Sequence, residues 1–242
     1  MTLFQSLPRD TVSVSVALEA CVATLAQARA AVDAGATRVE LCGPGEGGTT
    51  PSMGLLEECL SSLAVPVHVM IRGHTEDFVV STDWRTIMAR DVWHAVQAGA
   101  HAVVIGPLTA SGEVDVATTR ALLESAEHVP VVFHRAFDRV PDQSRALDTL
   151  IELGISAVLT AGGQSRALDG ALVLAQLQAR AGDRLTIMAG GGVRSDNVGA
   201  LLRAAPLRAV HARATEPEVF AATAMALRDY LAQRTRTNEQ ST

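Results

Sequence analysis

The chain has 242 residues, a length that fits one large domain or two small ones. Hydrophobic residues make up 48% and charged residues 19%, and no apolar run reaches the ~20 residues that a membrane-spanning helix needs. A spanning segment is therefore excluded, and no membrane partner is expected. The net charge is −6 and all 20 basic residues are arginines without a clustered run, so we do not expect a nucleic-acid partner either. The polar N-terminus lacks a signal-peptide pattern, which predicts a cytoplasmic protein.

Short runs rich in valine and isoleucine alternate with alanine- and leucine-rich stretches of helical period along the chain. The sequence predicts strands over 14–21, 67–72, 131–137 and 184–188. Each run is too short for a helix and is bounded by stretches that favour helices or turns.

A repeated pattern of helix, glycine and buried strand supplies further strands. Its copies contain Gly35, Gly99 and Gly154, and a glycine-free copy covers 207–213. Each glycine stands where a helix ends in the left-handed conformation that glycine adopts most easily. These repeats indicate units of one strand and one helix.

Eight predicted strands alternating with helices favour a single-domain (β/α)8 TIM barrel over residues 1–242. Its core is expected over about 14–232, with short polar extensions at both ends. The alternative is a doubly wound open sheet, but the first helix lacks the Gly-x-Gly-x-x-Gly pattern typical of nucleotide-binding members of that class.

Polar side chains at the carboxyl ends of the strands are the candidates for chemistry, because TIM barrels build their sites there. The candidates for proton transfer are Glu19, Glu40, His68, Arg72, His134 and Asp138. His134 and Asp138 are expected to form a histidine–carboxylate pair. The alternative is a structural ring in which Glu19 or Glu40 holds Arg72 and His134 is simply buried.

Two cysteines occur in the same context, Glu19-x-Cys21 and Glu40-x-Cys42, at the ends of neighbouring strands. Adjacent strands lie about 4.8 Å apart, so the two sulfurs can approach one ion. A thiolate pair suits Cu(I), and Met70 is a possible third soft ligand. The alternative is that both cysteines are small buried side chains, as we expect for Cys59 in the core.

Two glycine-rich segments follow predicted strands. The segment 43–52 is expected to cover the barrel mouth or to form a rigid crossover, with Ser52 as the N-cap of a helix that begins near Met53. Gly190, Gly191 and Gly192 follow the seventh strand, where barrels often bind phosphate, and with Arg213 they predict an anion site. Ser195 is the expected N-cap of the next helix.

Several segments together resemble the CutC family of copper homeostasis proteins, in order from about residue 15 to residue 215. The segments are Ala17-Leu-Glu-Ala-Cys-Val, Arg38-Val-Glu-Leu-Cys, Glu46-Gly-Gly-Thr-Thr-Pro-Ser, Val67-His-Val-Met-Ile-Arg, Val103-Val-Ile-Gly, Phe133-His-Arg-Ala-Phe-Asp, Val158-Leu-Thr and Gly190-Gly-Gly-Val. The resemblance implies a (β/α)8 barrel, a cytoplasmic homo-oligomer, with a dimer favoured, and Cu(I) ligands at Cys21 and Cys42. The segment His211-Ala-Arg-Ala departs from the family pattern, which places a bulky cation, Arg213, at the pocket.

Two functions follow from these patterns. The first is copper homeostasis through Cu(I) binding by the cysteine pair. The alternative is a TIM-barrel enzyme of lyase or isomerase type for a small anionic or sugar-like metabolite, because a two-thiol metal site does not need the surrounding Glu, His and Arg residues. The chain contains no lysine, so a Schiff-base mechanism is excluded.

Overall fold

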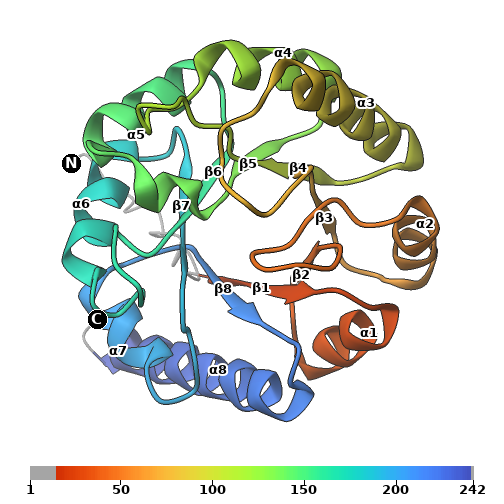
Figure 1. The fold of residues 1–242 in the computed structure, drawn as a ribbon. Coiled ribbons are helices and arrows are strands. Elements are labelled where there is room, and N and C mark those ends of the chain that lie inside the picture. Colours follow the sequence, from red (N-terminus) through yellow and green to blue (C-terminus); the bar gives the residue numbers. More distant parts are fainter. Residues whose placement is uncertain (1–14, 241–242) are drawn as a thin grey trace, which may run out of the picture.

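The structure is a computed structural model that describes residues 15–240. Its parallel strands close into a barrel in the order β1 to β8, surrounded by helices (Figure 1). The strands are β1 (Ala17–Val22), β2 (Arg38–Leu41), β3 (Val67–Met70), β4 (Ala102–Ile105), β5 (Val131–Phe133), β6 (Ala157–Thr160), β7 (Thr186–Gly190) and β8 (Ala209–Arg213). The predicted (β/α)8 TIM barrel is confirmed, and the open sheet is excluded because β1 pairs with β8.

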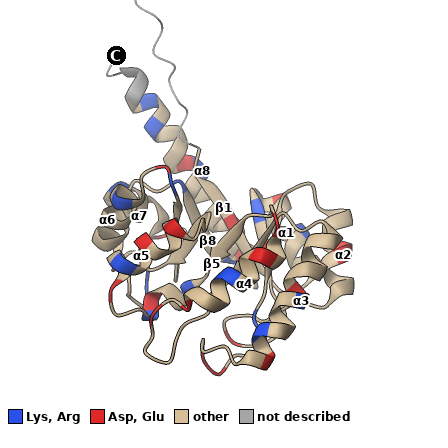
Figure 2. Ribbon diagram, turned by 90° about the horizontal axis from the view of Figure 1, so that it is seen from above, with Lys and Arg blue, Asp and Glu red and all other residues tan. Residues whose placement is uncertain are grey.

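A helix follows each strand and covers the outside of the barrel (Figure 1). The helices are α1 (Leu25–Ala34), α2 (Met53–Ser62), α3 (Thr82–Ala98), α4 (Val116–Ala126), α5 (Gln143–Glu152), α6 (Ala171–Ala181), α7 (Val198–Ala204) and α8 (Pro217–Gln240), with a 3-10 helix η1 (Arg135–Arg139) after β5. The C-terminal end of α8 extends beyond the barrel (Figure 2). Within residues 15–240, no helix combines the length and the apolar character needed to cross a bilayer.

The predicted glycine turns end the helices as expected. Gly35 and Gly99 have φ of 109° and 97°, and the amide of each donates to two carbonyl groups of the preceding helix. Ser52 caps α2, because its side chain accepts a hydrogen bond from the amide of Leu55 at 3.3 Å. These local signals set where each strand begins after its helix.

Some predicted boundaries were wrong. The strand predicted over 131–137 ends at Phe133, because Nδ1 of His134 accepts the amide hydrogen of Ala136 at 3.1 Å and turns the chain into η1. Ser195 does not cap α7, which begins only at Val198. The first strand begins at Ala17, and residue 14 of its predicted range lies outside the described residues.

The interior of the barrel is divided into an apolar part and a polar part. Small and flexible apolar side chains from β4 to β7 fill one part, including Val104, Val132, Leu159 and Met188. The outward-facing residues of the strands form a separate and larger apolar core with the helices. Charged side chains on β1, β2, β3 and β8 fill the polar part of the interior, which is where the candidate site lies.

Candidate functional site

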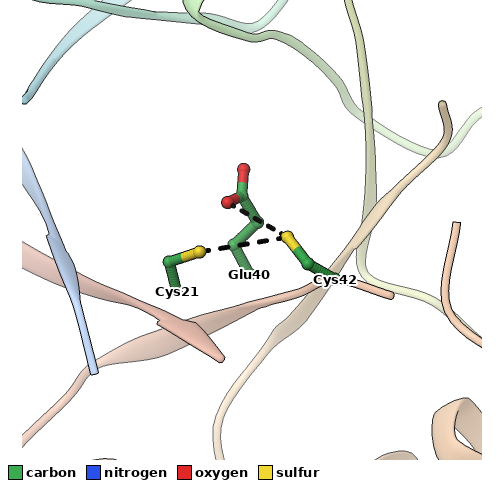
Figure 3. A group of neighbouring side chains, drawn as sticks. All are labelled: Cys21, Glu40 and Cys42. Atoms are coloured by element: carbon green, nitrogen blue, oxygen red, sulfur yellow. Dashed lines mark hydrogen bonds between the residues drawn. The ribbon is translucent and has the colours of Figure 1, made fainter. Parts of the chain in front are cut away.

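The structure brings Cys21 and Cys42 together at the carboxyl end of the barrel. Cys21 lies near the end of β1 and Cys42 directly follows β2, and their Sγ atoms are 3.9 Å apart. The Sγ of Cys42 also lies 3.6 Å from Oε2 of Glu40, which is a second acceptor, beside Cys21, for its single thiol proton. Figure 3 shows the two thiol side chains pointing toward one another beside Glu40. Both cysteines are free, as is Cys59 in the core.

A charged network lies below the thiol pair, further from the mouth. Glu19 is fully buried and accepts a hydrogen bond from Nε of Arg38 at 2.7 Å. Nδ1 of His211 lies 2.9 Å from Oε1 of Glu19, and Nδ1 of His68 lies 2.9 Å from Oε2 in a contact that lacks hydrogen-bond alignment. The network connects to the thiol pair through Nε2 of His211, which is 3.8 Å from Oε2 of Glu40, the carboxyl group beside Cys42.

Burial and the neighbouring charges shift the pKa values of Glu19 and Glu40 in opposite directions. Burial works against ionisation of Glu19, but the hydrogen bond with His211, the close contact of His68 and the charges of His211 and Arg38 hold its pKa well below the usual range. Burial raises the pKa of Glu40 well above its usual range. Burial also opposes protonation of His211, yet its acidic neighbours raise its pKa, so the imidazolium forms an ion pair with the Glu19 carboxylate.

The thiol pair holds its two groups in different protonation states. The hydrogen bond from Cys42 lowers the pKa of Cys21, while the same bond together with burial raises the pKa of Cys42. The pair therefore favours one thiolate and one thiol that share a proton. Because the thiolate is the form that binds metals, Cys21 is prepared for a ligand role.

The glycine-rich segment 43–50 folds over the thiol pair as a small hairpin, the orange segment that reaches toward the barrel opening in Figure 1. The amide of Gly43 donates to the carbonyl of Thr49 at 2.7 Å. A Cβ added to Gly48 would lie 2.8 Å from Sγ of Cys42, and the φ of Gly48 is 80°. The segment therefore needs glycine to lie this close to the sulfur.

Arg72 is not part of the structural ring of glutamates and arginine that the sequence offered as an alternative. Its guanidinium donates to the carbonyl oxygens of Glu46, Gly48 and Thr75, and neither Glu19 nor Glu40 holds it. Arg38 takes the place beside Glu19 instead. Sequence analysis did not assign Arg38 to the site, although its position two residues before Glu40 gives it the inward parity of that residue.

The predicted pair of His134 and Asp138 is wrong. Asp138 lies in η1 and accepts hydrogen bonds from the Thr160 hydroxyl and from the amides of Ala161 and Gly163. Arg135 adds an ion pair at 2.8 Å. The 3-10 turn points Asp138 toward the loop after β6, so it stabilises that loop and does not contact His134.

The predicted anion residues are brought to the same pocket as the thiol pair, with one exception. A pocket of about 640 Å³ at the mouth is lined by Cys21, Cys42, Gly191, Gly192 and Arg213. Gly190 does not line it, because its backbone packs against Leu159 and His211 inside the barrel.

Two clusters have the donor atoms of a metal site. Cys21, Glu40 and Cys42 place their donor atoms within 4.8 Å of one another, and so do Glu19, Glu40 and His211. The second cluster is occupied by its own ion pairs with Arg38 and His68. The first offers two sulfurs, which are soft donors, at the edge of an accessible pocket.

Comparison with known proteins relates this chain to one family. Residues 16–216 match the profile described as the CutC family. The chain is 42% identical over 201 residues to a family protein CutC of Xanthomonas campestris pv. campestris (strain B100), covering 83% of this chain and 84% of that protein. It is 44% identical over 187 residues to a family protein CutC of Xylella fastidiosa (strain 9a5c), covering 77% of this chain and 70% of that protein.

Solved structures agree with this relationship. A Streptococcus agalactiae protein that carries the name copper homeostasis protein CutC superposes with a TM-score of 0.78 at 32% identity, covering 81% of this chain and 97% of that chain. Phosphoribosylanthranilate isomerase of Thermotoga maritima superposes with a TM-score of 0.58 at 13% identity, covering 88% of this chain and 99% of that chain. The second similarity shows the barrel fold alone.

Proposed function

Because the chain belongs to the CutC family, we propose that it acts in copper homeostasis by binding one Cu(I) ion between Cys21 and Cys42. The observation that carries this proposal is the 3.9 Å separation of the two sulfurs at the mouth of the barrel. The copper ion is the cargo of the protein in this proposal.

The geometry of the pair suits a bent arrangement around one ion. Metal–thiolate bonds of about 2.3 Å would span up to about 4.6 Å in a straight line, so a separation of 3.9 Å leaves one side of the ion open. The Met70 side chain lies beside Cys42, since its Cγ and the Cys42 sulfur are both within 4 Å of the Cβ position built on Gly48, and we propose its thioether as the third donor. Two thiolates and a thioether form a donor set that favours Cu(I).

The protonation of Glu40, the carboxyl group beside the thiol pair, favours binding of a soft metal ion over a hard one. Burial raises the pKa of Glu40, which favours its neutral form and weakens it as a ligand for a divalent cation. Sulfur then dominates the donor set. We therefore expect Cu(I) to be preferred over Zn(II).

Location and assembly are part of the same proposal. Three free cysteines, two of them in contact, suit a reducing compartment, and we place the protein in the cytoplasm. We also expect a homodimer, which light scattering of the purified protein would measure.

Titration of fully reduced protein with Cu(I) against a calibrated chelator tests the proposal. We expect one ion per chain, with affinity lost in Cys21→Ser and in Cys42→Ser and retained in Cys59→Ala, whose side chain lies in the core. Competition with Zn(II) should leave Cu(I) bound. Binding that survives both serine substitutions would refute the thiolate site, and displacement of Cu(I) by Zn(II) would refute the preference for Cu(I).

A further inference from the structure

The pocket at the barrel mouth carries an excess of positive charge that copper binding does not explain. Four arginines line it, at positions 72, 135, 194 and 213, against the carboxyl groups of Glu40 and Glu46. Of the four, Arg135 is paired with a carboxylate, that of Asp138. Among residues 15–240, neither Arg194 nor Arg213 forms an ion pair. Because Cu(I) is a cation, it cannot neutralise these guanidinium groups, and only an anionic ligand would do so.

Arg72 is the most deeply placed of the four. It is 9% exposed, its guanidinium carbon lies 4.9 Å from the centroid of the Phe78 ring, and its hydrogen bonds go only to backbone carbonyl oxygens. Its Nε has no partner in the described part of the chain. Burial lowers the pKa of Arg72 despite the nearby charges of Asp77 and Glu46, so an anionic ligand would supply counter-charge that these carboxylates do not.

His134 adds an uncharged donor to the same pocket. Its Nδ1 accepts the amide hydrogen of Ala136, so the ring proton lies on Nε2. Burial and the charge of Arg72 lower the pKa of His134 to about 3, which keeps the ring neutral. The Nε2–H group of His134 is therefore a hydrogen-bond donor available to a ligand oxygen.

The loop after β7 supplies backbone donors. Gly191 and Gly192 have φ of 114° and 65°, and within residues 15–240 their amides donate no hydrogen bond. The guanidinium of Arg135 lies over this turn, because a Cβ on Gly191 would be 3.3 Å from its Cζ. Free amides next to a guanidinium form a site for a phosphate or another oxyanion.

Arg213 joins this donor surface to the thiol pair. In the pairing of β1 with β8, Arg213 is the register partner of Cys21. A ligand that spans from the β7 loop to Arg213 therefore lies beside the sulfur pair. The pocket of about 640 Å³ accommodates a molecule of the size of a pentose phosphate.

We propose that this pocket is a binding site for a small organic phosphate, with its phosphoryl group held by Arg135 and the amides of Gly191 and Gly192, and its remaining oxygens by Arg72, His134 and Arg213. Phosphate is favoured over a carboxylate because these donors approach from several directions and carry several charges. The proposal is independent of copper binding, because none of these donors is a thiol.

Thermal unfolding and calorimetry of metal-free, reduced full-length protein test the proposal with ribose 5-phosphate as the probe. We expect a rise in Tm that ribose does not produce, and tighter binding than that of inorganic phosphate or of citrate. Arg135→Gln and Arg213→Gln should each weaken binding of the probe at least tenfold. The control Arg145→Gln, at a side chain that is 76% exposed and outside the pocket, should bind as the wild type does.

The double variant Cys21→Ala/Cys42→Ala separates this proposal from the copper site. It should lose Cu(I) binding and retain the effect of ribose 5-phosphate on Tm. The anion site is refuted if millimolar ribose 5-phosphate leaves Tm unchanged, or if both arginine variants retain wild-type affinity. If inorganic phosphate and ribose 5-phosphate bound with equal affinity, the proposal that the pocket recognises the organic part of the ligand would be refuted.

Discussion

Nε of Arg38 lies 2.7 Å from Oε2 of Glu19 on the neighbouring strand, inside the barrel and below the thiol pair. Glu19 is fully buried, so its charge depends on this contact and on the two histidines beside it. Nη2 of Arg38 also donates to the sulfur of Met188 on β7, 2.9 Å away. Arg38 therefore links the polar and apolar parts of the interior.

Removal of this guanidinium should destabilise the fold. Arg38→Met leaves the buried Glu19 carboxylate with fewer compensating charges, and we expect a loss of about 3–5 kcal/mol in the free energy of unfolding. Chemical denaturation of the full chain measures this loss. Arg208→Met is the matched control, since the ion pair of Arg208 with Asp183 is exposed and should contribute less than about 1 kcal/mol. Equal effects of the two substitutions would contradict the role given to Arg38.

A methyl group on the hairpin should disturb the thiol pair. In Gly48→Ala the new Cβ meets the Cys42 sulfur at 2.8 Å and is attached to a residue with φ of 80°. We expect a stability loss of about 1–3 kcal/mol and at least tenfold weaker Cu(I) binding in the chelator competition. Gly54→Ala, in α2 with open space around it, should instead stabilise the protein by about 0.5–1 kcal/mol. Unchanged Cu(I) affinity in Gly48→Ala would show that the hairpin does not constrain Cys42.

Acid should destabilise the protein through His134. The folded pKa of about 3 lies below the value of about 6.5 expected for the unfolded chain, so the unfolded state binds more protons between these values. Stability contributed by the neutral ring is complete above pH 6.5 and falls by about 1.4 kcal/mol per pH unit as the pH decreases toward 3.

The free energy of unfolding as a function of pH measures this dependence. His134→Asn, whose side-chain oxygen can accept the amide hydrogen of Ala136, should show a shallower loss of stability below pH 6.5 than the wild type. His128→Asn, at a side chain that is 87% exposed, should leave the slope unchanged. Parallel curves for the wild type and His134→Asn would contradict the assignment.

Asp138 should matter for the fold and not for the metal. Asp138→Asn replaces an acceptor of the Thr160 hydroxyl and of two backbone amides with a group that has only one acceptor oxygen, and we expect a loss of about 1–3 kcal/mol in the free energy of unfolding. Cu(I) affinity should remain within twofold of the wild type. The same substitution at Asp142, the N-cap of α5, is the control and should be nearly neutral, because asparagine caps helices as well as aspartate does. A large drop in Cu(I) affinity for Asp138→Asn would return this residue to the site.

The barrel and the approach of Cys21 to Cys42 could be predicted from the sequence because both depend on local rules. Glycines at helix ends divide the chain into units, and the alternation of side chains along a strand places Cys21 and Cys42 on inward-facing positions. Parallel pairing of neighbouring strands then brings the sulfurs together. No contact between distant elements needed to be known in advance.

The features that sequence analysis missed depend on contacts that no local pattern encodes. The alternation of side chains places Arg38 inside the barrel, but its pairing with Glu19 follows only from the register between β1 and β2. The failure of the His134 and Asp138 pair comes from a single hydrogen bond to the amide of Ala136, which ends β5 early. Arg72 binds loop carbonyl groups that become neighbours only after the hairpin has folded.

The hairpin touches both proposed sites, since Gly48 packs on the sulfur of Cys42 and Gly47 lies against the guanidinium of Arg72. A ligand that shifts this hairpin from either side changes the other side as well. Thermodynamic linkage then makes the effect mutual: the factor by which a phosphate changes the affinity for Cu(I) equals the factor by which Cu(I) changes the affinity for the phosphate. Gly47 and Gly48 are therefore the two residues through which the proposed metal and phosphate sites would be coupled.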